Sequence, residues 1–101
     1  MLILRKEAEE DIREAYDWYE NQRQFLGGSF LSEIESTLEL IHENTQLYAH
    51  AYKSIRRALC KRFPYAVYYM ENASNIVVIA VLQQRRKPTV CCMAKKIVNV
   101  T

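Results

Sequence analysis

Glycine and proline are both scarce in this sequence, with two of each among 101 residues. Such scarcity excludes collagen-like repeats and loop-dominated scaffolds. Half of the residues are hydrophobic and 26% are charged, a balance that supports a buried core and excludes an intrinsically disordered chain. At this length, the composition indicates one globular domain over residues 1–101.

Long apolar stretches are also lacking. The longest strongly apolar run, Ile76–Leu82, has seven residues, whereas a bilayer-spanning helix needs about 20. The N-terminus places its apolar residues before its basic ones and has no small-residue cleavage site, unlike a secretory signal. We therefore expect a cytoplasmic protein without a membrane partner.

Cysteine is rare and unevenly placed. The three cysteines, Cys60, Cys91 and Cys92, are odd in number, and two of them are adjacent. This spacing suits neither a strain-free mutual disulfide nor a pair of zinc ligands. The two histidines, His42 and His50, are not clustered with the cysteines, and no glycine-rich phosphate loop occurs. The sequence predicts reduced thiols, no metal site and no cofactor.

Acidic and basic residues are segregated along the chain. Residues 1–50 carry four basic and eleven acidic side chains, a net charge of −7. Residues 51–101 carry ten basic side chains against Glu71 alone, a net charge of +9. A single carboxylate leaves these cations few partners within their half. The charge pattern predicts a surface that attracts polyanions or acidic peptides.

The acidic half has the periodicity of two helices. An apolar run of strand length at residues 1–4 comes first. From Glu7 the apolar residues recur with a 3.6-residue period, and acidic residues in the first turn complement the helix dipole. Gly27 and Gly28 are expected to break the chain before a second helix, which is predicted from about Ser29 to a terminator at Asn44. The two helices would form a hairpin.

The basic half has the two-residue period of β-strands, after a polar loop over residues 45–53. Three strands are predicted, at Ile55–Lys61, Tyr65–Glu71 and Asn75–Leu82. Pro88 should end regular structure, and residues 89–101 form a weakly patterned tail. We predict an α+β fold: an N-terminal strand, a helical hairpin and then a three-stranded antiparallel meander, with the helices packed on one face of the sheet.

The other face of this sheet is expected to carry cations. Alternation puts Arg56 and Arg57 on opposite faces of their strand, and the sequence does not decide which of them faces the open side. Tyr65 and Tyr69 share one face, and Tyr68 takes the other. The candidate target-binding residues are Arg56, Arg57, Lys61, Arg62, Arg85 and Arg86.

Several segments occur in an order that is informative as a set. They are the run Ile55–Tyr69 with its Phe-Pro-Tyr centre, the apolar strand after it, and the basic segment Arg85–Pro88. The segments Ala8–Ile12 and Gly28–Glu35 of the helical hairpin belong to the same set. Over about residues 1–90 the chain resembles the RelE/ParE toxin superfamily of bacterial type II toxin–antitoxin systems, and within it the ParE branch.

The resemblance implies a toxin that arrests growth, serves plasmid stabilisation and is neutralised by a cognate, ParD-like antitoxin. ParE members inhibit DNA gyrase, so nucleic acid would be contacted through that target. An alternative is a ribosome-dependent messenger-RNA endonuclease of RelE type, for which the candidate catalytic residues are Lys61, Arg62, Tyr69 and Arg85.

RelE-type nucleases tend to place a histidine or tyrosine after the last strand. Residues 83–101 contain neither, which favours the ParE interpretation. A non-toxic binding module of the same fold is a third alternative, because the fold alone does not choose between mechanisms.

Overall fold

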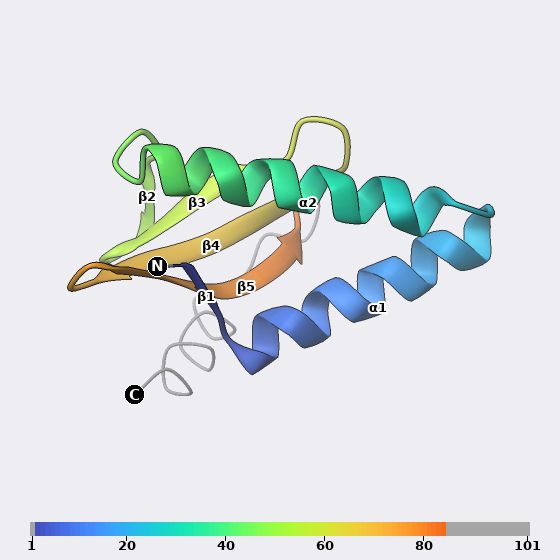
Figure 1. Cartoon of the computed structure of the whole chain (residues 1–101), viewed down its shortest axis with the longest axis horizontal. Helices are drawn as coiled ribbons and strands as arrows, with labels where there is room; N and C mark the ends of the chain where they lie inside the picture. The colour runs from blue at the N-terminus through green and yellow to red at the C-terminus, as the bar shows by residue number, and fades with distance from the viewer. Residues whose placement is uncertain (1, 85–101) are drawn as a thin grey trace.

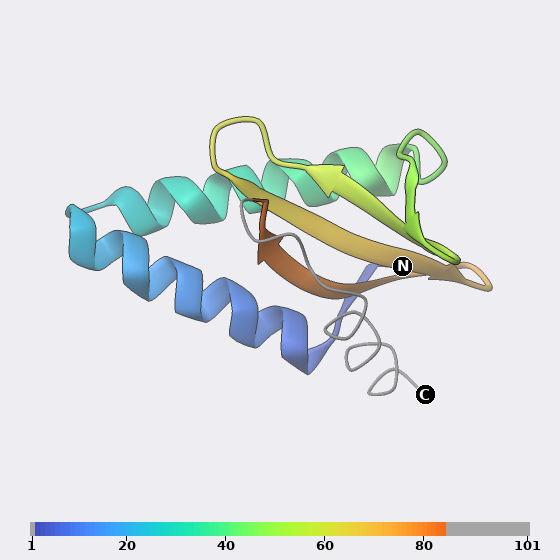
Figure 2. The same ribbon diagram turned by 180° about the vertical axis from the view of Figure 1, so that it is seen from behind.

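The computed structural model describes residues 2–84 and places two helices on one face of a sheet (Figure 1). The elements are β1 (Leu2–Leu4), α1 (Lys6–Gln22), α2 (Leu26–Glu43), β2 (His50–Tyr52), β3 (Ile55–Leu59), β4 (Tyr65–Asn72) and β5 (Asn75–Gln83). The helices lie in front of the sheet in Figure 1 and behind it in the opposite view of Figure 2. The predicted α+β fold with a helical hairpin on one face is confirmed.

The sheet has five strands in the order β1-β5-β4-β3-β2. Strand β1 pairs with β5 in parallel, with Leu4 opposite Val78, and the other pairs are antiparallel. The sheet is therefore mixed, and the antiparallel part has four strands where the sequence predicted three. The parallel pairing of β1 with β5 requires a long crossover, and the helical hairpin forms the first part of it.

The additional strand is β2, which lies within the segment expected to be a loop. It has three residues, two of them exposed, and is too short to show the alternating apolar pattern of a half-buried strand. It pairs with β3 across a tight turn in which Lys53 has a φ of 51°. Pairing with β3, which is invisible in local sequence, makes this segment a strand.

The predicted break at Gly27-Gly28 is wrong. Both glycines lie in the first turn of α2, and the chain reverses direction over residues 23–25, where Phe25 has a φ of 70°. The two carboxylate oxygens of Glu20 accept hydrogen bonds from the N–H groups of Phe25 and Gly27, each at 3.0 Å. A side chain from α1 therefore satisfies two N–H groups at the start of α2, and no glycine is needed for the turn.

Gly27 has a packing role instead. A Cβ at this position would lie 2.9 Å from the Tyr16 ring and 2.9 Å from a carboxylate oxygen of Glu20. The two helices approach each other closely here because position 27 has no side chain. At Gly28 a Cβ would meet nothing within 4 Å.

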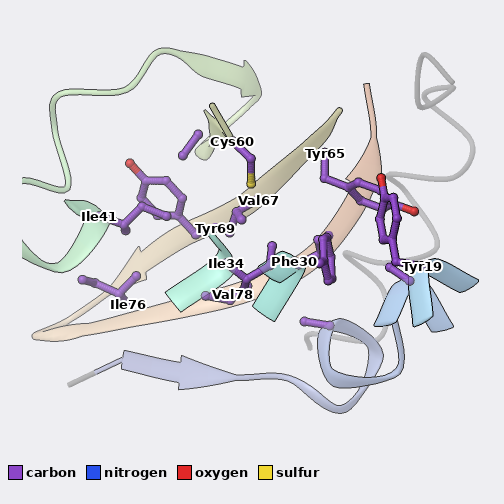
Figure 3. Packing of buried hydrophobic residues seen from close by; sticks show 14 residues of the cluster. Tyr19, Phe30, Ile34, Ile41, Cys60, Tyr65, Val67, Tyr69, Ile76 and Val78 are labelled. Atoms are coloured by element: carbon purple, nitrogen blue, oxygen red, sulfur yellow. The ribbon is translucent and has the colours of Figure 1, made fainter. Parts of the chain in front are cut away.

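The main core lies between the helices and the sheet (Figure 3). Tyr19, Phe30 and Tyr65 gather at one end of this core, with ring centroids 5.1–6.0 Å apart. The run 76–81 of β5 is buried throughout, as its uninterrupted apolar sequence predicts for a strand covered on both faces.

The other face of the sheet is apolar, which corrects the expectation of a basic face. Its buried residues are Ile55, Ala66, Tyr68, Ile79 and Ala80. Of the predicted cations within residues 2–84, only Arg57 projects from a strand on this side, beside Tyr68. The expectation failed because β5 alternates apolar residues onto both faces, and these outnumber the arginines of β3.

Candidate functional site

The register of β3 against β4 assigns the two adjacent arginines to opposite faces. Arg56 pairs with Tyr69, and Arg57 pairs with Tyr68. Cross-strand partners share a face, so Arg56 lies on the side of the helices and Arg57 on the opposite side. The Arg56 guanidinium is half-buried and donates a hydrogen bond to the carbonyl oxygen of Tyr48. Arg57 is exposed.

Tyr69 is buried in the main core. Its side chain is 0% exposed, and its hydroxyl donates a 2.7 Å hydrogen bond to the carbonyl oxygen of Thr45. Burial raises the pKa of Tyr69 to about 12, against a smaller lowering by the Arg56 charge. The phenol is therefore protonated at neutral pH and already bonded. This geometry fits a role in holding the loop after α2, and it offers no path for a substrate to the hydroxyl.

Lys61 and Arg62 lie in the loop that joins β3 to β4, residues 60–64, which we call the basic loop. Strand β3 ends at Leu59, two residues earlier than predicted. It ends there because Pro64 lies in the connection to β4 and backbone hydrogen bonds turn the chain back toward that strand. The N–H of Cys60 donates to the Tyr65 carbonyl at 2.9 Å. Both cationic side chains are exposed, and no ion pair joins either of them to a described carboxylate.

Aromatic packing holds the basic loop against the helices. The Phe63 ring lies 4.9 Å from the Tyr19 ring of α1 and 5.5 Å from the Phe30 ring of α2. Since Phe63 is anchored in the core, the two residues before it are presented on a fixed backbone.

The end of β5 is bonded to the same loop. The backbone N–H of Gln84 donates to the Pro64 carbonyl at 2.8 Å, and its side-chain amide donates to the Tyr65 carbonyl at 2.9 Å. Arg85 and Arg86 lie outside the described residues and follow Gln84 directly in the sequence. The fold therefore places the basic loop beside Gln84, the residue that directly precedes the predicted cations Arg85 and Arg86 in the sequence.

Neither histidine of the chain belongs to the basic loop. His42 lies in the last turn of α2 and His50 begins β2, and both are exposed. Over residues 2–84, no three histidine, cysteine or acidic side chains are grouped to hold a metal ion. Cys91 and Cys92 lie outside the described residues.

Cys60 is a buried free thiol. Burial raises its pKa and the nearby Glu33 charge adds to this, against a smaller lowering by Thr37. The Thr37 hydroxyl lies 3.6 Å from the Cys60 sulfur and donates to the Glu33 carbonyl at 2.9 Å. The cysteine is thus a protonated packing residue.

Two hollows flank β1 on the helical side, and together we call them the hairpin groove. One, of about 370 Å³, is lined by Leu4, Glu9, Ile12, Arg13, Tyr16 and Leu31. The other, of about 330 Å³, is lined by Leu2, Leu38, Glu39, His42 and Glu43. Three carboxylates against one arginine give the groove an acidic rim around an apolar floor.

The sequence contained a signal for this groove that was assigned to the core. Ile12, Leu31 and Leu38 belong to the apolar stripes of the two helices, but the structure leaves them only partly buried. Their stripes are wider than the sheet can cover, because α1 and α2 diverge toward β1 (Figure 1).

Comparison with known proteins places this architecture in a family. The family model described as the ParE toxin of type II toxin-antitoxin system, parDE, matches residues 2–88. A solved chain described as "Chromosomal ParDE TA system from P. aeruginosa" is similar in fold, with a TM-score of 0.63, 15% sequence identity and coverage of 81% of this chain and 92% of that one.

No curated protein matches the sequence. Within residues 2–84 neither helix is long and apolar enough to span a membrane. The family match extends over most of the chain and includes every element of the fold, from β1 to β5. The chain belongs to the ParE toxin family of type II toxin–antitoxin systems.

Proposed function

We propose that this protein is a cytoplasmic toxin that inhibits DNA gyrase by binding to it, and that a cognate, ParD-like antitoxin neutralises it. Family membership supports the proposal. The observation that supports action by binding, and not by RNA cleavage, concerns Tyr69: its hydroxyl is buried and bonded to the carbonyl oxygen of Thr45. Cleavage of RNA needs a proton acceptor and a donor within reach of the substrate, and Tyr69 cannot serve as either.

The basic loop is the part of the described surface that we assign to the target. Lys61 and Arg62 are exposed and free of ion pairs with described carboxylates, so their charges are available to a partner. Arg57 is an exposed cation on strand β3, and Arg85 and Arg86 complete the predicted set. Arg56 is excluded from it because its guanidinium is bonded to Tyr48.

The direct test is the supercoiling of relaxed plasmid by purified bacterial DNA gyrase, with and without the protein. Inhibition that rises with toxin concentration and is reversed by antitoxin is the expected result. Gyrase that stays fully active at a large molar excess of toxin would exclude the proposed target. Codon-specific cleavage of messenger RNA in a translating extract would instead favour the RelE-like alternative.

The hairpin groove is the surface that we assign to the antitoxin. An apolar floor that is open to solvent on a small domain fits an amphipathic segment that folds as it binds. The acidic rim adds a condition: the segment that lies in the groove should carry basic residues at its edges. The charge pattern of the sequence predicted a partner such as an acidic peptide, and that charge suits the basic loop rather than this groove.

A pair of leucines on α2 tests this assignment. Leu38 lines the groove, whereas Leu40 is 41% exposed outside it. Leu38→Asp is expected to arrest growth and to escape neutralisation by the cognate antitoxin, whereas Leu40→Asp stays neutralisable. Because an unfolded variant would lose toxicity, persistent growth arrest separates loss of binding from loss of folding. Equal neutralisation of both variants would contradict the assignment.

A further inference from the structure

Trp18 is the sole tryptophan of the chain and lies on the surface of α1. Its side chain is 53% exposed, while the next residue, Tyr19, is buried. The Trp18 ring lies edge-on against the Tyr19 ring, with centroids 5.0 Å apart. This contact orients an exposed tryptophan, and tryptophan is enriched among the residues that dominate protein–protein binding energies.

The position of Trp18 on α1 follows from its spacing to Asp11. The Asp11 carboxylate accepts a 3.0 Å hydrogen bond from the N–H of Val81, so this face of α1 lies along the edge of β5 beyond β1. Trp18 is seven residues later, about two turns, and therefore shares that face about 10 Å farther along the helix. Since β5 runs beside α1, Trp18 lies toward the end of β5, where Gln84 is bonded to the basic loop.

Aromatic contacts place the basic loop at this same end of the molecule. Tyr19, which carries the Trp18 contact, lies 4.9 Å from the Phe63 ring and 6.0 Å from the Tyr65 ring. Phe63 directly follows Lys61 and Arg62 in the loop. One exposed aromatic ring and two exposed cations are thus supported by a single packed cluster, of which Figure 3 shows Tyr19, Phe30 and Tyr65.

The charges around Trp18 favour a protein partner over a nucleic acid. Glu14, one turn before Trp18, and Asp17, beside it, are exposed carboxylates on α1. They would repel a phosphate backbone laid across the tryptophan. A protein surface can instead place an apolar side chain against the ring and carboxylates against the loop.

We propose that Trp18, Lys61 and Arg62 form one surface that binds a protein presenting an apolar side chain beside carboxylates, with Trp18 as its central apolar contact. The inference rests on the proposed function, in which the protein bound by this surface is DNA gyrase. It adds a residue of the acidic helical half to a target surface that the sequence placed in the basic half alone.

The test compares Trp18→Ala with Phe25→Ala in the gyrase supercoiling assay. Phe25 is a matched control because it is 74% exposed at the turn between the helices, outside the proposed surface. Trp18→Ala is expected to raise the half-inhibitory concentration at least about tenfold, and Phe25→Ala to change it less than about twofold. Trp18→Phe, which retains an aromatic ring, should fall between Trp18→Ala and the wild type.

The experiment distinguishes three cases: an unfolded variant, a wrong inference about Trp18 and a wrong proposed function. Neutralisation by antitoxin and a thermal unfolding midpoint close to that of the wild type show that Trp18→Ala is folded. If the wild type inhibits gyrase and folded Trp18→Ala inhibits it equally well, the Trp18 inference is overturned and the proposed function stands. If the wild type leaves gyrase active, both are overturned.

The choice of a protein partner has its own test, because DNA contains no tryptophan and Trp18 is the only one in this chain. Its fluorescence is expected to be unchanged when duplex or single-stranded oligonucleotides are added without gyrase. Saturable quenching by either oligonucleotide would show that the ring stacks on nucleic acid and would overturn the proposed partner class.

Discussion

The hydroxyl of Tyr69 joins the core to the loop after α2, and its burial makes its effect on stability depend on pH. The folded protein raises the pKa of Tyr69 from 10.0 to about 12, so it holds the phenolic proton more tightly than the unfolded chain does. The stabilisation is therefore complete below the unfolded pKa and is lost as the pH rises toward the folded one.

Replacement of Tyr69 by phenylalanine should remove this pH dependence. At neutral pH, Tyr69→Phe is expected to be less stable by about 1 kcal/mol, since the Thr45 carbonyl loses its donor. As the pH rises from about 10 toward about 12, the wild type should lose more stability than the variant. Denaturant unfolding at a series of pH values measures this difference, and parallel curves for the two proteins would contradict it.

The same variant separates the two candidate activities. Because the hydroxyl is buried and bonded, Tyr69→Phe should retain growth arrest, and loss of toxicity in a folded variant would indicate a catalytic phenol.

Arg56 and Arg57 mark the limit of sequence reasoning at the scale of single residues. Alternation along β3 correctly placed them on opposite faces, but it could not choose the face for each. That choice depends on the pairing of β3 with β4 and on which face of β4 the helices cover. Both are long-range facts that a local pattern does not contain.

At the scale of elements, the helical hairpin depends on a contact between α1 and α2. Its sequence periodicity predicted both helices, and Asn44 ends α2 as expected, with its N–H bonded to the Leu40 carbonyl at 3.1 Å. The turn between them was mispredicted because the usual helix-breaking role of glycine was assumed at a site where glycine serves close packing. The Glu20 carboxylate that supports the turn acts across seven residues, beyond the reach of a capping motif.

The adjacent glycines provide a matched pair of substitutions for this contact. Gly27→Ala should destabilise the protein by about 1–3 kcal/mol, because the new methyl group would displace the Tyr16 ring and the Glu20 carboxylate. Gly28→Ala should be neutral or stabilising by up to about 1 kcal/mol, since it adds helix propensity in open space. Thermal or denaturant unfolding of the two variants checks this, and equal effects would show that the helices do not approach closely at Gly27.

At the scale of the whole molecule, the two proposed binding surfaces lie on different sides of α1. Ile12 and Tyr16 line the hairpin groove toward α2, whereas Asp11 reaches β5 and Trp18 shares that side. An antitoxin segment in the groove alone would leave the basic loop uncovered. We therefore expect the complete antitoxin to extend beyond the groove, with basic residues over the helices and acidic residues near the loop.

The sequence predicted the α+β class and the separation of charge, because these follow from local periodicity and composition. It predicted the family through the resemblance of its segments to those of ParE toxins. It did not predict that the sheet face opposite the helices is apolar, since that depends on how β4 and β5 combine their residues. Of the predicted basic surface, the structure retains the basic loop. Exposure of a cation is easier to predict in a loop than on a strand, because on a strand it depends on which face the residue takes.

The central claim is that the basic loop binds the target, and a comparison of two double variants tests it most directly. The double variant Lys61→Ala, Arg62→Ala is matched by Lys6→Ala, Arg23→Ala, which also removes two exposed cations. The measurement is the half-inhibitory concentration of each protein in gyrase supercoiling. The loop variant is expected to inhibit at least about tenfold more weakly than the wild type, with the matched variant near wild type. Equal inhibition by both variants would contradict the claim.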